Sequence, residues 1–215
     1  MTQTPHYKLT YFPIRGRGEV IRWLFLLAGV PYQEEFLDFQ TEWPIRKSTT
    51  PWGGLPVLSV DHGQLVISQH TAIARYLARR FGLTGKDAGE NALIDMFVEA
   101  TVDLYGDPWG EISNATIVGN VEKRKTAIAE WISAKFIPYL DTLSKFLSAN
   151  TSGWLVGDRV TWADVYVCEF LDRIRSLFEP SVFKKHQIVA NYLDRFLSIQ
   201  PIEERTLKRN FQIPL

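Results

Sequence analysis

The period of the hydrophobic pattern changes along the chain. Tyr7, Leu9 and Tyr11 fall on one face of a predicted strand at residues 7–12, and a second strand is predicted at residues 32–39. Two short strands, at residues 57–60 and 64–67, are predicted on either side of the hairpin signal Asp61-His62-Gly63. Apolar residues at helical spacing predict helices over residues 20–28 and 69–81, each followed by a glycine that can end it. This order predicts a small α/β layer and not a long doubly wound sheet.

Only helical patterns follow the segment 82–89, whose three glycines interrupt both periodicities. We therefore expect one domain at residues 1–82, a linker at 83–89 and an all-helical domain at 90–215. Within the helical part, Pro138 is expected to kink a helix. The clearest helix start is Thr161, where Asp164 takes the place of the usual Glu in a capping box. The last helix can begin at Pro201.

Composition and charge exclude several classes of function. The chain has 215 residues, with 24 basic and 24 acidic side chains, so its zero net charge argues against a general nucleic-acid binder. The single cysteine, Cys168, excludes an intrachain disulfide, and four histidines without ligand spacing predict no metal site. No secretion signal and no apolar run long enough for a bilayer are present, so we expect a cytoplasmic protein without membrane contact.

Tyr11 is the first candidate for chemistry, because it ends a predicted strand just before a glycine-rich turn. A phenol is a hydrogen-bond donor at neutral pH, and a bond to an anion contributes about 1.5–3 kcal/mol. That energy would lower a thiol pKa by about one to two units, and Arg17 in the turn could add positive field. An aromatic side chain that only packs in the strand explains the same local pattern.

Two further segments could hold a ligand. Leu55 and Pro56 open a short strand after a Gly-Gly turn, where the backbone of Leu55 could pair with an extended peptide. The segment 68–71 opens a helix whose exposed amides favour a carboxylate or phosphate. An ordinary turn and simple capping by Ser68 are the alternatives. Cys168 lies in a predicted helix among apolar residues, which is typical of a buried thiol.

Five segments, in this order, resemble the cytosolic glutathione transferases. They are Tyr7-Lys-Leu-Thr-Tyr-Phe12 with Arg15-Gly-Arg-Gly-Glu19, Trp43-Pro-Ile-Arg-Lys47, Leu55-Pro-Val-Leu58, Ala72-Ile-Ala-Arg-Tyr-Leu-Ala78 and Gly157-Asp-Arg-Val-Thr-Trp-Ala-Asp164. The chain is most similar to the sigma class, which includes invertebrate enzymes and vertebrate haematopoietic prostaglandin D synthase. This resemblance implies a thioredoxin-like N-terminal domain and an all-helical C-terminal domain.

The resemblance also implies a site and its ligands. Reduced glutathione would be a co-substrate, with no prosthetic group and no metal, and the second substrate would be a hydrophobic electrophile. Tyr11 would hold the sulfur as thiolate, supported by Arg17. The remaining glutathione contacts would come from Trp43, Lys47, Gly54, Leu55, Pro56, Gln69 and His70. Asp103 would reach the glutathione of a neighbouring subunit, which implies a homodimer, and Tyr105 and Trp109 would line the electrophile pocket.

Two positions depart from the family pattern. The family usually has serine where this chain has His70, so one hydroxyl donor to the γ-glutamyl carboxylate is missing. The loss of such a bond weakens binding by roughly 1.5–3 kcal/mol, unless the His70 ring or Thr71 replaces it. Gly54 stands where glutamine is commoner, so only its backbone can contribute.

Three functions remain open on this basis. The first is conjugation of glutathione to electrophiles, as in detoxification, with both substrates held in one cleft. The second is the glutathione-dependent isomerisation that forms prostaglandin D2, which uses the same sulfur chemistry. The third is a non-catalytic structural protein like the S-crystallins, a reading that His70 favours and that the retained Tyr11, Arg17, Trp43 and Lys47 oppose.

Overall fold

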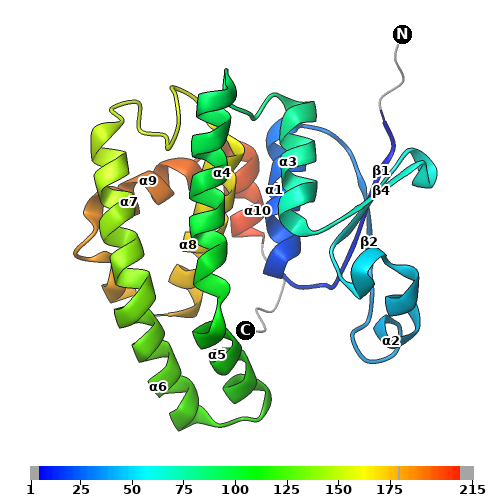
Figure 1. Ribbon diagram of the computed structural model, residues 1–215, viewed down its shortest axis with the longest axis horizontal. Helices are drawn as coiled ribbons and strands as arrows, with labels where there is room; N and C mark the ends of the chain where they lie inside the picture. The colour runs from blue at the N-terminus through cyan, green and yellow to red at the C-terminus, as the bar shows by residue number, and fades with distance from the viewer. Residues whose placement is uncertain (1–4, 179, 209–215) are drawn as a thin grey trace. The chain divides into compact units, whose positions relative to one another are not determined.

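The computed structural model in Figure 1 describes residues 5–178 and 180–208, apart from the side chains of residues 107–109, 113, 117 and 180. The described residues form two compact units. Unit 1 consists of residues 5–83 together with 200–208, and unit 2 consists of 84–199 without 179. Among the described residues, no helix is both long and apolar enough to cross a membrane.

The described part of unit 1 contains a four-stranded mixed sheet in the order β2-β1-β3-β4. Its strands are β1 (Tyr7–Tyr11), β2 (Gln33–Phe36), β3 (Val57–Val60) and β4 (Leu65–Ser68). β1 pairs with β2 in parallel and with β3 antiparallel, and β3 pairs antiparallel with β4. The two central strands carry the core residues of the sheet, among them the fully buried Leu9 and Leu58. The predicted α/β layer is therefore confirmed.

Four described helices belong to unit 1. They are α1 (Glu19–Ala28), the short α2 (Trp43–Arg46), α3 (His70–Phe81) and α10 (Gln200–Leu207). α1 packs against both α3 and α10, and Figure 1 shows α1 and α3 side by side next to the strands. Short 3-10 turns in this unit are Gly16–Gly18, Lys47–Thr49, Pro51–Gly53 and Asp61–Gly63.

Unit 2 is helical throughout its described residues, as predicted. Its helices are α4 (Ala88–Val102), α5 (Asp107–Ile117), α6 (Val121–Trp131), α7 (Ile137–Ala149), α8 (Trp162–Leu177) and α9 (Gln187–Leu197). Short turns lie at Asp103–Tyr105 and Pro180–Phe183. α8 is the core helix of the unit, because residues 162–174 are all buried and α4 and α9 both pack against it.

The predicted kink at Pro138 takes the form of a change in helix type. Five residues, Ile132–Phe136, are π-helical, and α7 then starts with Pro138 in its first turn. Proline has no N–H and its ring crowds the preceding turn, so an α-helical bond cannot pass through this position. The wider π-helical turn accommodates the proline while the helical path continues from α6 into α7.

Asp164 joins three segments of unit 2 at the start of α8. Its carboxylate is fully buried and accepts the N–H of Thr161 at 2.8 Å, as the sequence predicted, and also the N–H of Leu155 at 2.9 Å. The hydroxyl of Tyr192 on α9 donates to the same carboxylate at 2.9 Å. Burial raises the pKa of Asp164, and these hydrogen bonds oppose that rise.

The last helix of the described residues, α10, belongs to unit 1, although the expected helical domain included residues 200–208. Ile202 of α10 is fully buried, and Arg205 binds the carboxylate of Glu19 on α1 through two hydrogen bonds, at 2.7 and 2.9 Å. Helical periodicity predicts that a segment is a helix, but it contains no information about which unit the helix packs on. The pairing of α10 with α1 therefore had to come from the structure.

Candidate functional site

The topology of the sheet brings most of the candidate residues to one end of unit 1. Thr10 pairs with Val57, so the end of β1 lies beside the start of β3. Val57 also pairs with Ser68, which brings the end of β4 and the start of α3 to the same edge. Because β2 runs parallel to β1, the segment that leads to α2 leaves from this edge too. Tyr11, Leu55 and Gln69 each lie within two residues of these paired positions and are thus neighbours in space.

The Tyr11 side chain lies directly against two glycines, Gly16 and Gly18. A Cβ atom on Gly16 would lie 2.5 Å from the Tyr11 hydroxyl oxygen, and one on Gly18 would lie 2.4 Å from the ring carbon Cδ1. Such distances are far inside normal contact, so any side chain at Gly18 must displace the ring. Tyr11 itself is 6% exposed. The glycine-rich turn that the sequence marked as a loop therefore positions the phenol.

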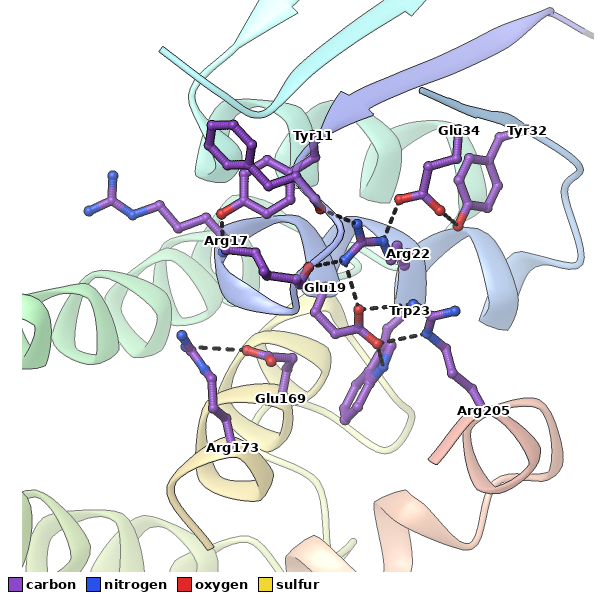
Figure 2. A network of polar contacts seen from close by, with 12 residues as sticks. Tyr11, Arg17, Glu19, Arg22, Trp23, Tyr32, Glu34, Glu169, Arg173 and Arg205 are labelled. Carbon is purple, nitrogen blue, oxygen red and sulfur yellow. Dashed lines mark hydrogen bonds and ion pairs between the residues drawn. The ribbon is translucent and has the colours of Figure 1, made fainter. Parts of the chain in front are cut away.

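The contact between Tyr11 and Arg17 is made by the main chain. The Arg17 N–H donates to the Tyr11 hydroxyl oxygen at 3.0 Å. The Arg17 side chain is exposed and extends away from that hydroxyl (Figure 2). A hydroxyl that accepts a hydrogen bond becomes a stronger donor, because the two bonds polarise the same O–H group. The loop backbone thus prepares the phenol to donate to an anion.

Aromatic contacts connect Tyr11 to the segment around α2. Phe12 lies between the two, with ring centroids 5.6 Å from Tyr11 and 5.7 Å from Trp43. Trp43 is half-buried at the start of α2, and Lys47 is exposed just after it. The Lys47 side chain passes near Gly53, where an added Cβ would lie 3.7 Å from its Cε atom.

The turn before β3 contains a cis peptide bond and the exposed ring of Trp52. The Leu55–Pro56 bond is cis, Pro56 is buried, and Gly54 has extended backbone. Trp52, at a φ of 58°, is 87% exposed. Leu55 lies two residues before Val57, the first paired residue of β3, and its N–H and C=O could pair with a bound peptide.

The start of α3 carries the next two candidates. Gln69 has a φ of 71°, a conformation that is uncommon without glycine, and its side chain makes no capping bond within the described chain. His70 is the first helical residue and is 8% exposed. A helix start without a side-chain cap offers N–H groups and the positive end of the helix dipole to a carboxylate. Strained backbone of this kind clusters at binding sites.

The three remaining candidates lie in unit 2. Asp103 is exposed at the end of α4, and Tyr105 follows it after one residue. The Tyr105 ring packs against Phe170, with centroids 5.3 Å apart, and the Arg173 guanidinium lies 5.1 Å from its centroid. Trp109 is in α5, but its side chain lies outside the described residues.

The sequence did not point to the ionic network behind the Tyr11 loop (Figure 2). Glu19 is 1% exposed at the first position of α1. Its carboxylate accepts from Arg22 at 3.0 Å, from the Trp23 indole at 3.1 Å, and from both ends of the Arg205 guanidinium. Burial alone raises the pKa of Glu19, but the bonds and charge of Arg205, with the charges of Arg22 and Arg15, outweigh burial and lower it to about 2.

Arg22 extends this network to the loop and to β2. Its Nη1 donates to the carbonyl oxygen of Ile14 at 2.7 Å, and its Nη2 donates to that of Phe12 at 3.3 Å. Its Nε pairs with Glu34 of β2, and its guanidinium lies 5.7 Å from the Tyr11 ring centroid. The acidic residue within Arg15-Gly-Arg-Gly-Glu19 was the available signal, but a helix-start carboxylate is common enough to conceal this role.

Together these features suit a small peptide that carries a carboxylate and, in addition, a second anionic group. The phenol can donate to the anion, the open backbone at Leu55 can pair with the peptide, and the start of α3 can bind the carboxylate. No group of three or more metal-ligating side chains occurs within residues 5–178 and 180–208.

Two family models match the chain. The model described as "Glutathione S-transferase, N-terminal domain" matches residues 7–79, and "Glutathione S-transferase, C-terminal domain" matches residues 110–204. The first match covers the sheet and most of α3, and the second lies mostly in unit 2.

Individual relatives match nearly the whole chain. Glutathione S-transferase 1 of Ascaris suum is 36% identical over 207 residues, which are 95% of this chain and 97% of the relative. Hematopoietic prostaglandin D synthase of Homo sapiens is 31% identical over 217 residues, 98% of this chain and 100% of the relative. The crystal structure of monomeric Na-GST-3, a glutathione S-transferase of Necator americanus, is similar with a TM-score of 0.81 at 33% identity, over 96% of this chain and 98% of that chain.

The Gly18 contact predicts a specific packing defect. Gly18 has a φ of −81°, which alanine adopts freely, so in Gly18→Ala only the clash with Tyr11 matters. We expect a loss of about 1–3 kcal/mol in the free energy of unfolding, measured by urea denaturation. The control is Gly110→Ala in α5, where an added Cβ meets nothing within 4 Å and a gain of up to about 1 kcal/mol is expected. Equal stability of the two variants would contradict the packing role of Gly18.

The low pKa of Glu19 predicts a pH-dependent contribution to stability. Its folded pKa of about 2 lies below the ordinary value of 4.5, so the contribution is complete above pH 4.5 and is lost as the pH falls toward 2. We therefore expect the stability difference between the native chain and Glu19→Gln to shrink by roughly 2 kcal/mol between pH 7 and pH 3. Urea denaturation at each pH measures it, with Glu203→Gln on exposed α10 surface as control. A difference that stays constant with pH would show that Glu19 is not held as an anion.

Proposed function

Because the chain belongs to the glutathione S-transferase family, we propose that it conjugates reduced glutathione to electrophilic small molecules, with the Tyr11 hydroxyl stabilising the glutathione thiolate. The observation that carries this proposal is the buried phenol at the end of β1, which accepts the Arg17 N–H at 3.0 Å while its ring rests on two glycines. That arrangement holds one hydroxyl in a single orientation, as a thiolate partner requires.

The chemistry follows from the acidity of the thiol. A free thiol has a pKa near 8.5 and is mostly protonated at neutral pH. A hydrogen bond to the anion is worth about one to two pKa units, so the bound thiol is largely ionised at pH 7.4. The thiolate then attacks an electrophilic carbon, forming a carbon–sulfur bond, while a leaving group departs or a conjugated double bond accepts the electrons and a proton.

For glutathione binding we propose contacts from the same end of unit 1. Trp43 and Lys47, on and after α2, would meet the glycine end of the tripeptide. The backbone of Leu55, with Gly54 and Pro56 around it, would pair with the cysteinyl residue. Gln69 and His70 at the start of α3 would bind the γ-glutamyl carboxylate through main-chain N–H groups.

For the second substrate we propose an apolar wall that includes Tyr105 and Trp109. Support for Tyr105 is its ring, which packs on Phe170 and under the Arg173 guanidinium and so has a fixed position within unit 2. Support for Trp109 comes only from the resemblance of its segment to the family.

We propose the sigma class and a homodimer in which Asp103 reaches the neighbouring subunit's glutathione. The similarity to human hematopoietic prostaglandin D synthase supports the class. The exposed position of Asp103 is compatible with contact to another subunit. The similar Na-GST-3 of Necator americanus is described as monomeric, so family membership alone does not require a dimer. Sedimentation equilibrium, which separates 24.7 kDa from twice that mass, decides the question.

A second candidate function is glutathione-dependent isomerisation of a prostaglandin endoperoxide. The observation that favours it is the 31% identity to hematopoietic prostaglandin D synthase along 98% of this chain. The same thiolate would serve both reactions, so the comparison of turnover on prostaglandin H2 with turnover on 1-chloro-2,4-dinitrobenzene distinguishes them. Glutathione binding without a thiolate and without turnover would instead support the non-catalytic alternative.

Removal of the Tyr11 hydroxyl is expected to raise the pKa of the bound glutathione thiol but to leave glutathione binding nearly unchanged. Tyr11→Phe should lower kcat at pH 6.5 by about ten-fold or more, because one bond to a charged sulfur is lost. The glutathione Kd should stay within about two-fold, since the backbone contacts remain. The control is Tyr7→Phe. Tyr7 lies on β1 like Tyr11, but its hydroxyl contacts Arg80, so its removal should leave kcat unchanged. Unchanged kcat in Tyr11→Phe would remove the phenol from the mechanism.

Replacement of His70 by serine is expected to strengthen glutathione binding. His70→Ser restores a hydroxyl donor at the uncapped start of α3, which should lower the glutathione Kd about ten-fold by isothermal titration calorimetry. His70→Ala removes the same ring without adding a donor, so it should show no such gain. If serine binds no more tightly than histidine, the imidazole already supplies the missing donor.

A further inference from the structure

The contact between Arg205 and Glu19 joins the start of α1 to a helix 186 residues further along the chain. Both guanidinium bonds are short, at 2.7 and 2.9 Å, and the Arg205 side chain is only 21% exposed. This is the bidentate geometry that fixes both position and orientation of a carboxylate. Glu19 is only two residues beyond Arg17, whose N–H contacts Tyr11.

The network holds the Tyr11 loop from both sides (Figure 2). Glu19 anchors the end of the loop, where the chain enters α1. The same carboxylate binds Arg22, whose guanidinium bonds the carbonyl oxygens of Phe12 and Ile14 at the beginning of the loop. Between these anchors lie the two glycines on which the Tyr11 ring rests. The loop therefore has little freedom to shift while the network is intact.

We propose that Arg205 is a positioning residue for the thiolate: by fixing Glu19, and through it Arg22, it holds the Arg17 N–H and the Tyr11 hydroxyl in the geometry that lowers the pKa of the bound glutathione sulfur. The proposal rests on the proposed function, because it assigns to α10 a part in the thiolate's surroundings. Arg205 acts through other residues.

The charges around Glu19 explain why Arg205 has this influence. Arg15, Arg22 and Arg205 are the cations that lower the pKa of Glu19, and burial opposes them. Arg22 also pairs with Glu34, whose other oxygen accepts from the Tyr32 hydroxyl at 3.4 Å. Arg22 already pairs with both Glu19 and Glu34. Without Arg205, the carboxylate of Glu19 depends on Arg22 and Arg15 for its neutralisation, and a stronger pull on Arg22 loosens its bonds to the loop carbonyls.

The test measures the glutathione thiolate directly. Ultraviolet difference spectra of the protein with saturating glutathione, recorded across pH, give the pKa of the bound thiol. In Arg205→Met, which keeps a long apolar stem, we expect this pKa to rise by about 0.5–1 unit. The rate of reaction with 1-chloro-2,4-dinitrobenzene should fall about three- to ten-fold well below the pKa and recover well above it, while the KM for glutathione changes little. Arg205→Lys, which keeps the charge but one bond fewer, should lie between.

A matched control separates positioning from general effects of α10. Lys208→Met removes a cation near the end of the same helix, from a side chain that is 78% exposed and pairs with Glu204, so it should leave the thiol pKa unchanged. All variants are compared at a temperature well below their unfolding midpoints. If Arg205→Met does not fold, Arg205→Lys carries the test with a smaller expected shift. An unchanged thiol pKa in the variant used overturns the proposal.

A double-mutant cycle with Tyr11→Phe shows whether Arg205 acts through the hydroxyl. When the hydroxyl is absent, Arg205→Met should cause no further change in thiol pKa or kcat. An equal loss in both backgrounds would mean a general structural role and would overturn the proposal. Native protein without any thiolate would instead overturn the proposed function. A native thiolate that needs Tyr11 but not Arg205 would overturn only the positioning role.

Discussion

One buried carboxylate decides the geometry of the Tyr11 loop. Glu19 is almost fully removed from water, and an unpaired charge in that position would cost several kcal/mol. It is stable there because arginines surround it and because Arg205 matches both of its oxygens. The same ion pairs that satisfy the charge also tie down the loop carbonyls through Arg22. Charge neutralisation and loop placement are thus one requirement and not two.

The sheet decides which segments of unit 1 lie next to Tyr11. Its strand order and directions bring the ends of β1 and β4 to the start of β3, so residues distant in sequence meet without long loops. Strand register decides which residues lie side by side, but it does not orient a hydroxyl. That last step depends on the two glycines, which let the Tyr11 ring lie against the loop backbone where a side chain would clash with it, and on the ionic network. Thioredoxin-like topology and loop chemistry therefore contribute at different levels of precision.

Local features of this structure were predictable from the sequence and long-range pairings were not. The strands, the helix that ends at Gly29 and the capping role of Asp164 all depend on residues within a few positions of each other. The resemblance to a known family named the residues that gather at the end of the sheet. The placement of α10 against α1 was not predictable, because a partner for Glu19 so far along the chain leaves no trace in periodicity. The main-chain hydrogen bond of Arg17 was not predictable either, because a sequence specifies the side chain of a residue and not the direction of its N–H group.

The distance along the chain between Glu19 and Arg205 has a consequence for the order in which the protein is made. Synthesis proceeds from the N-terminus, so the sheet, α1 and the Tyr11 loop leave the ribosome long before α10 exists. Until then Glu19 lacks the guanidinium that binds both its oxygens, and the loop cannot reach its final geometry. Unit 1 is therefore completed by α10, which is synthesised after the residues of unit 2, and not by residues 5–83 alone. A contact of such high sequence separation also forms slowly, because a long loop of chain must close before the two side chains meet.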